Sequence, residues 1–246
     1  MNTLKACWKL ARALLHIVAG LLTILLVFPR LSQEKKEIRI QAWSIEMLGC
    51  LGIKLVVTGQ PVRTGPMMLV ANHISWLDIT SLHAARYCRF VSKADVRHWP
   101  VIGALAAGVG TLFIERESRR DAMRVVQHMA ESLVAGDVLA VFPEGTTSDG
   151  LSLLPFHANL FQAAISADAP VQPVAMQFID QASGQRSLAP CYINDDTLMG
   201  SIWRTLTAPP LCAVVIFGDP QSAQGRDRRT WAADVRDTIT AMRASS

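Results

Sequence analysis

A histidine and an aspartate follow an apolar run, and they are the residues best suited to chemistry. Residues 67–71 are apolar, Asn72 and His73 come next, and Asp78 lies five positions after His73. An imidazole with an ordinary pKa of about 6.5 transfers protons near neutral pH. A carboxylate that holds one ring nitrogen fixes the tautomer and stabilises the imidazolium formed at the other nitrogen. The pair therefore predicts a general base.

The spacing of this pair indicates how the two side chains would meet. Successive helical residues are about 100° apart, so His73 and Asp78 would not share one face of a continuous helix. We expect His73 in a turn and Asp78 in the first turn of the helix that follows. Ser75-x-x-Asp78 also matches a helix capping box, in which Asp78 only accepts backbone N–H groups. Both interpretations stay open at this point.

Two later segments contain residues that can bind an anion. Residues 110–116 resemble a strand that ends at Arg116, and a cation at that end of a strand can hold a phosphate bidentately. In residues 142–148 a buried strand gives way to Glu144, Gly145 and three hydroxyl residues, a loop that can offer donors to an anion. Because Glu144 would repel a phosphate, we expect it to orient Arg116 or to accept from a substrate hydroxyl. The alternatives are that Arg116 is an ordinary solvated charge and that residues 142–148 form a plain turn.

Four segments, in this order, resemble the sequence blocks of the 1-acylglycerol-3-phosphate acyltransferase family. The first block, N-H-x-x-x-x-D, is matched by Asn72, His73 and Asp78. The second, G-x-x-F-I-x-R, is matched by Gly110, Phe113, Ile114 and Arg116, and the third, F-P-E-G-T followed by T-S, by Phe142 to Ser148. The fourth, an apolar residue followed by x-Pro and a second apolar residue, is matched by Val171, Pro173 and Val174. The resemblance covers residues 50 to 220 approximately, and the first and third blocks make it specific.

The resemblance implies transfer of an acyl chain from a thioester to the free hydroxyl of 1-acylglycerol-3-phosphate, which makes phosphatidic acid. His73, held by Asp78, would remove the proton of that hydroxyl. The implied substrate-binding residues are Phe113, Arg116, Glu144, Gly145 and Thr146, with Arg116 and the loop on the phosphate. The donor would be acyl-CoA or acyl carrier protein, and neither a metal nor another cofactor is implied.

One departure from the family pattern concerns the acceptor. After the third block many members have a Lys and then a Gly, in the pattern P-F-K-x-G, where this chain has Pro155-Phe156-His157-Ala158-Asn159. An imidazole binds phosphate less well than a lysine at pH 7. Other acceptors therefore stay open, namely a lyso-ornithine lipid or a lysophospholipid. A thioester hydrolase and a non-catalytic membrane-binding protein are further alternatives, which Arg116 and the intact His73–Asp78 pair argue against.

The N-terminus differs in composition from the rest of the chain. Half of all residues are hydrophobic, and residues 1–40 contain seven Lys or Arg and two Glu, so the remainder has a net charge of −1. Residues 13–28 are almost entirely apolar but too short alone for the roughly 30 Å hydrocarbon core. Extension back through Lys9 and Arg12 completes a span if both side chains snorkel. No small-x-small cleavage site follows, so we expect an uncleaved anchor, spanning or half-buried. Cations on both sides favour a segment that dips into the bilayer and returns.

We expect residues 1–50 to form membrane-anchoring helices and residues 51–246 an α/β acyltransferase domain. Residues 34–50 indicate a second helix, lying against either the bilayer or the core. Further on, short β-rich runs alternate with helical stretches, which predicts a mixed, largely parallel sheet flanked by helices. Residues 94–107 read as one helix and residues 181–210 as a loop-rich insertion.

Composition also limits the partners and the location. The basic N-terminus suits anionic lipid head groups. The rest of the chain has no basic stripe interleaved with aromatic residues, so nucleic-acid binding is not predicted. Five scattered cysteines without a C-x-x-C pair predict free thiols in a reducing compartment. The expected partners are a lysolipid acceptor, an acyl thioester donor and membrane lipids. The expected location is the cytoplasmic face of the inner (plasma) membrane.

Overall fold

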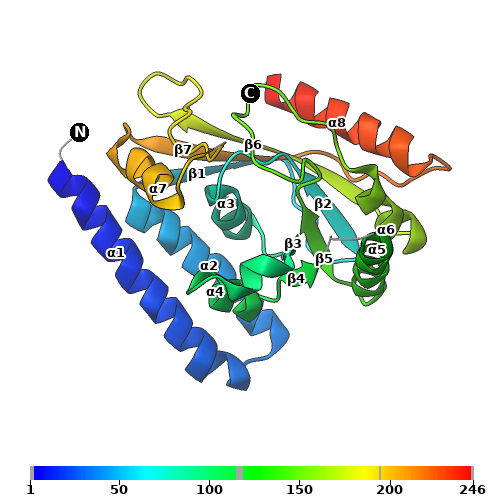
Figure 1. The fold of residues 1–246 in the computed structure, drawn as a ribbon, viewed down its shortest axis with the longest axis horizontal. Helices are drawn as coiled ribbons and strands as arrows, with labels where there is room; N and C mark the ends of the chain where they lie inside the picture. Colours follow the sequence, from blue (N-terminus) through cyan, green and yellow to red (C-terminus); the bar gives the residue numbers. More distant parts are fainter. Residues whose placement is uncertain (1–2, 115–118, 194, 245–246) are drawn as a thin grey trace.

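The computed structural model describes residues 3–114, 119–193 and 195–244. Within them lies a seven-stranded sheet in the order β1-β7-β6-β2-β5-β3-β4 (Figure 1). The strands are β1 (Ile53–Thr58), β2 (Met67–Ala71), β3 (Arg89–Lys93), β4 (Leu112–Ile114), β5 (Val138–Val141), β6 (Val171–Asp180) and β7 (Leu211–Phe217). Neighbouring strands run parallel except for β6 and β7, which are antiparallel. The predicted mixed, largely parallel sheet is confirmed.

Helices cover both faces of this sheet (Figure 1). They are α1 (Thr3–Leu22), α2 (Gln33–Leu51), α3 (Leu77–Ala85), α4 (Ile102–Gly108), α5 (Arg119–Val134), α6 (Phe161–Ser166), α7 (Leu198–Thr207) and α8 (Arg228–Ala244). The residues of β2 alternate between the two faces. Met68 and Val70 belong to a cluster with Trp231 of α8, whereas Leu69 belongs to one with Leu82 of α3. All five residues of β2 are therefore buried, which explains the unbroken apolar run.

The order of the central strands brings the predicted motifs together. β2 lies between β5 and β6 and runs parallel to both, with Val70 opposite Val141 and Pro173. Parallel neighbours end at the same edge of a sheet, so the residues after β2 and β5 meet there. Pro173 lies at the start of β6, before pairing with β7 begins at Val174, as expected for a proline in a strand.

The two N-terminal helices pack against each other through small residues. The buried residues of α1 are Ala6, Ala13 and Gly20, spaced seven apart. A Cβ at Gly20 would lie 2.6 Å from Trp43 Nε1, so the glycine permits the close approach of α2. Trp43 Nε1 donates to the carbonyl of His16 at 3.1 Å, and His16 Nε2 lies 2.9 Å from the carbonyl of Trp43. These contacts hold the helices as an antiparallel pair.

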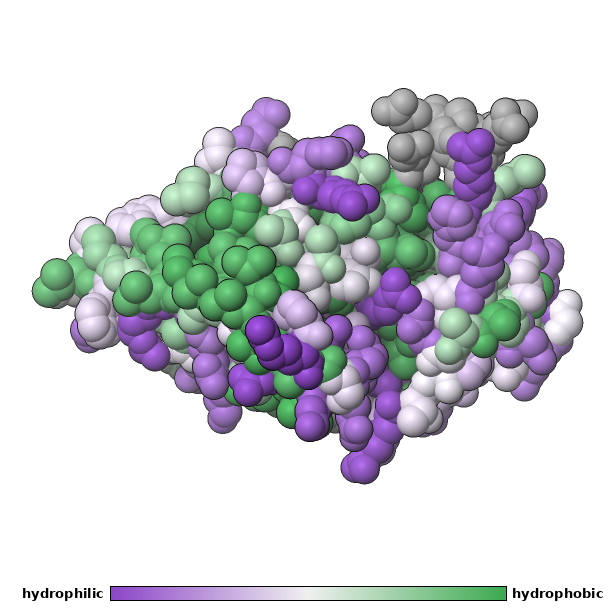
Figure 2. Space-filling model, turned by 90° about the horizontal axis from the view of Figure 1, so that it is seen from below, coloured by the Kyte–Doolittle hydropathy of each residue, from purple (hydrophilic) through white to green (hydrophobic). Residues whose placement is uncertain are grey.

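The outer face of α1 is hydrophobic. Figure 2 shows apolar residues gathered along the side of the molecule that carries this helix. Its exposed large apolar residues, with those of the turn that follows, are Leu4, Trp8, Leu14, Leu15, Val18, Leu22, Leu25 and Leu26. The helical segment Thr3–Arg30 has 28 residues and is long and apolar enough to cross a membrane. At 1.5 Å per residue it spans about 42 Å, more than the hydrocarbon core requires. It includes Lys9 and Arg12, as the predicted extension demanded, and it suggests membrane association.

Helix α2 joins the N-terminal pair to the sheet. Its buried residues are Ile40, Ser44, Met47, Leu48 and Leu51, and Met47, Leu48 and Leu51 share one hydrophobic cluster with Leu77 of α3. Ile38 and Ile45 are 61% and 51% exposed. Residues 34–50 therefore form the predicted second helix, with one side in the core. The division of the chain near residue 50 stays a prediction.

Two predicted segments differ from the structure. The single helix expected over residues 94–107 is interrupted at Trp99, whose extended backbone precedes Pro100, because proline disfavours a helical residue before it. Residues 181–210 contain α7, capped by Thr197, whose side chain accepts the N–H of Gly200 at 3.1 Å. Its buried side includes Ser201 and Thr205, and these polar residues conceal the hydrophobic period. The loop-rich prediction was wrong for these ten residues.

Candidate active site

His73 and Asp78 meet in the way that their spacing predicted. His73 lies in the turn after β2, and Asp78 lies in the first turn of α3. His73 Nδ1 is 2.8 Å from Asp78 Oδ2. The carboxylate is fully buried, whereas the imidazole side chain is 19% exposed. The buried carboxylate therefore orients the ring and can stabilise its protonated form.

Asp78 also has the capping role of the alternative interpretation. The same Oδ2 accepts the N–H groups of Ile74 at 2.6 Å and of Ser75 at 2.9 Å. The hydroxyl of Ser75 donates to the carbonyl of Pro190 at 2.6 Å. The two interpretations are compatible, because one carboxylate both closes the turn and holds the ring of His73.

The loop after β5 holds the backbone of His73 on both sides. The N–H of His73 donates to Glu144 Oε1 at 2.7 Å. Its carbonyl accepts the N–H of Ser148 at 2.9 Å, and the Ser148 hydroxyl lies 3.3 Å from the same oxygen. Residues 142–148, predicted as an anion-binding loop, therefore also form the support of the candidate base.

An aromatic side chain sets the plane of the imidazole. The ring of Phe142, the first residue after β5, stacks on His73 with centroids 4.0 Å apart and planes at 9°. Phe142 in turn stacks on Phe90 of β3, at 5.6 Å. Asp78 occupies Nδ1, and in the described part of the chain Nε2 has no hydrogen-bond partner. Nε2 is therefore the ring atom available to a substrate proton.

Asn72 joins the end of β2 to β6. Its side chain is buried, Nδ2 donates to the carbonyl of Met176 at 3.0 Å, and Oδ1 accepts the N–H of Met176 at 2.7 Å. The last backbone pair of these strands is Ala71 with Val174. The side-chain amide therefore continues the strand pairing beyond Ala71 and fixes the place where the chain turns into His73.

Glu144 has a role that its sequence position did not predict. It is only 4% exposed, and its second oxygen, Oε2, accepts the N–H of Leu154 at 2.9 Å. Burial raises the pKa of this carboxyl, while the N–H groups of His73 and Leu154 and the charges of His73 and Arg243 lower it. The carboxylate thus binds two backbone amides and positions the loop of His73. Its predicted partner Arg116 lies outside the described residues.

The exposed part of the loop carries the other predicted substrate-binding residues. Gly145 has a φ of 73°, and a Cβ there would lie 2.8 Å from His157 Nε2. The glycine therefore permits a left-handed backbone and makes room for the ring of His157. Thr146 is exposed, whereas the hydroxyl of Thr147 donates to the carbonyl of Tyr192. Gly145, Thr146 and His157 form the outer rim beside the candidate base, and their contact with substrate stays a prediction.

Phe113 lies on β4, the edge strand, two strands away from β5. Its neighbour across the pairing with β3 is Ser92, and its ring centroid is 6.0 Å from the guanidinium carbon of Arg97. No hydrogen bond or ring contact of the described residues joins it to His73. The roles of Phe113 and Arg116 on the substrate stay predictions.

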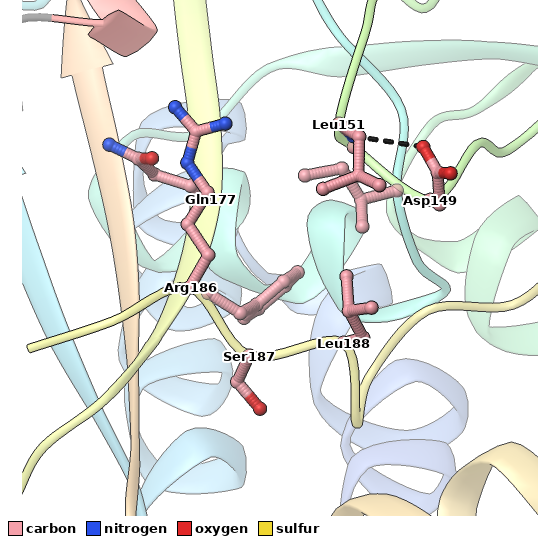
Figure 3. A pocket seen from close by; sticks show the side chains of 9 residues that line it. Asp149, Leu151, Gln177, Arg186, Ser187 and Leu188 are labelled. Atoms are coloured by element: carbon pink, nitrogen blue, oxygen red, sulfur yellow. Dashed lines mark hydrogen bonds between the residues drawn. The ribbon is translucent and has the colours of Figure 1, made fainter. Parts of the chain in front are cut away.

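Two depressions lie beside residues 148–151. The smaller, seen in Figure 3, has a volume of about 10 Å³ and is lined by Ile74, Asp149, Gly150, Leu151, Gln177, Phe178, Arg186, Ser187 and Leu188. Such a volume suits one water molecule and excludes a lipid head group. The larger has about 590 Å³ and is lined by Asp149, Leu188, Cys191, Ile193, Asp195, Asp196 and Arg204. Its size is that of a ligand site.

The described residues contain no group of three or more His, Cys, Asp or Glu side chains that could hold a metal ion. All five cysteines are free thiols. Burial raises the pKa of Cys191 to about 11, so this thiol is a poor nucleophile at neutral pH.

Sequence reasoning missed the long-range supports of the site. Phe142 and Ser148 lay within recognised motifs, yet nothing local indicated that they contact His73. Met176 carried no signal, because its backbone alone takes part. The polar Asn72 at the end of a buried strand was a usable signal, since a buried amide must find hydrogen-bond partners.

A largely parallel sheet with a histidine held by a buried carboxylate at the ends of its strands is an arrangement typical of an enzyme active site. Residues 54–177 match the sequence profile of the Acyltransferase family, and the protein belongs to that family. A 1-acyl-sn-glycerol-3-phosphate acyltransferase of Neisseria gonorrhoeae is 38% identical over 198 residues, 79% of this chain and 76% of the relative. A lyso-ornithine lipid O-acyltransferase of Pseudomonas aeruginosa is 38% identical over 197 residues, 80% of this chain and 75% of the relative. The crystal structure of the 1-acyl-sn-glycerophosphate acyltransferase of Thermotoga maritima has the same fold, with a TM-score of 0.70, 20% identity and coverage of 99% of this chain and 96% of that one.

Proposed function

We propose that this protein transfers an acyl chain from a thioester to the free hydroxyl of 1-acylglycerol-3-phosphate and so makes phosphatidic acid for phospholipid synthesis. The observation that carries the proposal is the His73–Asp78 pair, held at 2.8 Å at the edge of the sheet with Nε2 available. The Neisseria gonorrhoeae relative, with the acceptor in its name, supports this choice of substrate.

The geometry supports a direct transfer. As the acceptor oxygen attacks the thioester carbonyl carbon, its proton moves to Nε2 of His73. The C–S bond then breaks, and the imidazolium returns the proton to the departing thiolate. Asp78 keeps the ring oriented and stabilises its charge throughout. The N–H groups of His73, Ile74 and Ser75 are bonded to Glu144 and Asp78, so other donors would stabilise the oxyanion.

The acceptor head group would lie on the outer rim of the site. Phe113, Arg116, Gly145 and Thr146 would contact it, with Arg116 pairing with the phosphate. The buried Glu144 would act only by holding the loop. The reaction requires no metal and no cofactor besides the carrier of the thioester, either coenzyme A or acyl carrier protein.

A second acceptor, a lyso-ornithine lipid, is favoured by the acidic depression beside this loop. Asp149, Asp195 and Asp196 line it together with Arg204, which pairs with Asp196 at 2.9 Å. Carboxylates attract the ammonium group of an ornithine head and repel a phosphate. His157 in place of a lysine also disfavours a phosphate head group. The Pseudomonas aeruginosa relative carries the lyso-ornithine lipid in its name.

The test compares acceptors and one base variant. Detergent-solubilised protein receives a labelled acyl thioester with lysophosphatidic acid, lyso-ornithine lipid or lysophosphatidylethanolamine. We expect lysophosphatidic acid to have the highest kcat/KM, and His73→Ala to lose on the order of 10²–10⁴-fold. His128→Ala, at an exposed position of α5, is the matched control. Full activity of His73→Ala would overturn the mechanism.

The acidic depression supplies the test of the second acceptor. Asp149→Asn and Asp195→Asn should each lower acylation of the lyso-ornithine lipid relative to lysophosphatidic acid by up to about fivefold, which corresponds to the roughly 1 kcal/mol at the upper end for one surface charge contact. An unchanged ratio in both variants would exclude this depression as the head-group site.

The membrane location follows from the N-terminal helices. The exposed apolar face of α1 would lie in the bilayer, with the sheet on the cytoplasmic side, where acyl thioesters are available. In sealed membrane vesicles, protease should cleave the sheet domain only when the cytoplasmic face is outside. Cleavage from the opposite side would contradict this orientation.

A further inference from the structure

The segment of residues 189–193 crosses the turn that follows β2. The hydroxyl of Ser75 donates to the carbonyl of Pro190 at 2.6 Å. The N–H of Tyr192 donates to the carbonyl of Ile74 at 3.2 Å. Ser75 is fully buried, and a buried hydroxyl that loses its partner is costly. The chain at Pro190 must therefore stay in place for this turn to keep its form.

Ser75 connects this segment to the candidate base. Its N–H donates to Oδ2 of Asp78 at 2.9 Å, and the same oxygen holds Nδ1 of His73 at 2.8 Å. Its hydroxyl also accepts the N–H of Leu77, at the start of α3, at 3.2 Å. A displacement of Ser75 therefore disturbs the contact between Asp78 and His73.

Helix α7 holds the segment from the other side. Arg204 Nε donates to the carbonyl of Ala189 at 3.0 Å, and Nη2 donates to the carbonyl of Cys191. These two carbonyls belong to the residues on either side of Pro190. One turn earlier on α7, the hydroxyl of Ser201 lies 3.2 Å from the carbonyl of Cys191 and 3.4 Å from that of Pro190. The guanidinium is a planar, rigid group, so it fixes the segment at two points.

Asp196 orients this guanidinium. Its Oδ1 accepts from Nη1 of Arg204 at 3.1 Å and its Oδ2 from Nη2 at 2.9 Å, which makes a bidentate pair. Oδ2 also accepts the N–H of Ile193 at 3.2 Å. The side chain of Arg204 is 41% exposed, so the ion pair by itself contributes little to stability. The role of Arg204 follows from its geometry, because one planar group is bonded to two carbonyls and one carboxylate.

We propose that Arg204 is a positioning residue for acyl transfer. It holds Pro190 in place as the partner of Ser75, and through this contact the turn keeps Asp78 bonded to His73. The proposal rests on the proposed function only in taking His73 as the base. It gives α7 and the segment before it a part in the reaction, although neither contacts the imidazole.

The variants separate the position of the segment from the loss of an ion pair. Arg204→Met removes the hydrogen bonds of the guanidinium and keeps most of the side-chain length. Arg226→Met is the matched control, because Arg226 also pairs with an aspartate at 2.8 Å and donates to two backbone carbonyls. In the described part of the chain its hydrogen bonds stay within residues 221–234, away from the turn of His73. Ser75→Ala tests whether Arg204 acts through that hydroxyl.

We expect Arg204→Met to lower kcat by about tenfold with KM changed by less than about twofold, because misplacement of a reacting group affects the chemical step. Arg226→Met should leave kcat within about twofold of the wild type, and thermal melts in detergent verify that each variant is folded. Arg204→Lys should recover only part of the loss, since an ammonium group lacks the planar fork of donors. In the Ser75→Ala background Arg204→Met should lower kcat by less than about threefold, because the two residues act through one contact.

Three kinetic outcomes would overturn the proposal. A rise in KM with kcat unchanged would assign Arg204 to head-group binding in the larger depression, which it also lines. Equal losses of kcat in Arg204→Met and Arg226→Met would reduce its role to stability. An equal loss with and without the hydroxyl of Ser75 would break the link to the turn.

A readout independent of turnover separates this proposal from the proposed function. The downfield proton NMR resonance of the His73 Nδ1–H group reports its hydrogen bond to Asp78 and is assigned by its loss in His73→Ala. We expect this resonance to shift or broaden in Arg204→Met and to stay unchanged in Arg226→Met. If the wild type acylated no lysolipid but the resonance still moved, the proposed function would fail and the positioning role of Arg204 would stand. A resonance that does not move in Arg204→Met would overturn the proposal.

Discussion

Helix α3 has one histidine just before it and another in its last turn, and both belong to one row of rings. His73 stacks on Phe142 at 4.0 Å and Phe142 on Phe90 at 5.6 Å, and Phe90 and His83 meet in a T-shaped contact at 4.9 Å. His73 has the buried carboxylate of Asp78 on Nδ1 and is partly exposed. His83 is 4% exposed, and its Nε2 lies 2.9 Å from the carbonyl of Cys88.

The aromatic surroundings of the two rings are similar, so they do not determine which histidine can act as a base. Burial lowers the pKa of His83 to about 4, so its ring stays neutral at physiological pH. Its Nε2 must carry the proton, since only a donor can bond to a carbonyl. A general base needs an open nitrogen and a partner for the imidazolium, and only the N-terminal end of α3 supplies both.

Replacement of Asp78 by asparagine should have the largest effect, because it removes the main difference between the two histidines. The new amide side chain would still bond to the turn but would not stabilise the imidazolium. We expect Asp78→Asn to lower kcat by on the order of 10³–10⁴-fold. Steady-state kinetics with a saturating thioester would measure the loss, and a thermal melt in detergent would verify the fold. A loss below about tenfold would reduce Asp78 to the capping role alone.

Asn72→Ala should come next, since it breaks the joint between β2 and β6 that precedes His73. The N–H and carbonyl of Met176 would both be left buried without their partner. We expect the free energy of unfolding to fall by about 2–4 kcal/mol. Urea unfolding of the solubilised protein is the measurement, with Asn159→Ala, at an exposed site, as the control. An unfolding midpoint equal to that of the wild type would show that the amide is not a structural joint.

Phe142→Leu should have a smaller effect, because it removes the ring stacked on His73 but keeps an apolar side chain. Aromatic pairs contribute about 0.5–1.5 kcal/mol beyond burial, which corresponds to a fall in kcat of up to about tenfold. Phe156→Leu, at a partly buried position outside the row of rings, is the comparison. Equal changes in both variants would mean that stacking on Phe142 does not orient the base.

The contrast between local and distant contacts also explains what the sequence could predict. His73 and Asp78 are five residues apart, so spacing and helix geometry sufficed to predict their contact. By contrast, Glu144 lies 71 residues from His73, and Asn72 lies 104 residues from Met176. Those contacts depend on β2 lying between β5 and β6, and the hydrophobic pattern of a buried strand does not encode its neighbours. The pattern therefore predicted the type of sheet but not this order.

The helices illustrate the same limit. The outer face of α1 was visible as an apolar run, because nothing in the described structure covers it. In α7 the buried side includes Ser201, which bonds to the carbonyls of Pro190 and Cys191. In the sequence, a polar residue that is buried by such tertiary contacts looks like a solvent-exposed one. The hydrophobic period of a helix was therefore not visible in this segment.

His83→Gln should change activity least and sharpen the comparison from the other end of α3. We expect kcat to change by less than about twofold, because His83 does not transfer a proton in the proposed reaction. Its effect should appear in stability. Between pH 6.5 and about 4 the unfolded chain binds a proton at His83 that the native protein does not, so the free energy of unfolding falls as the pH is lowered, by about 3 kcal/mol in all. His83→Gln should remove this part of the pH dependence, whereas His128→Gln, at an exposed site, should keep it. The measurement is the free energy of unfolding in detergent between pH 4 and 7. If it depended on pH as steeply in His83→Gln as in the wild type, the native ring of His83 would be protonated in this range. The two histidines would then differ only in their partners.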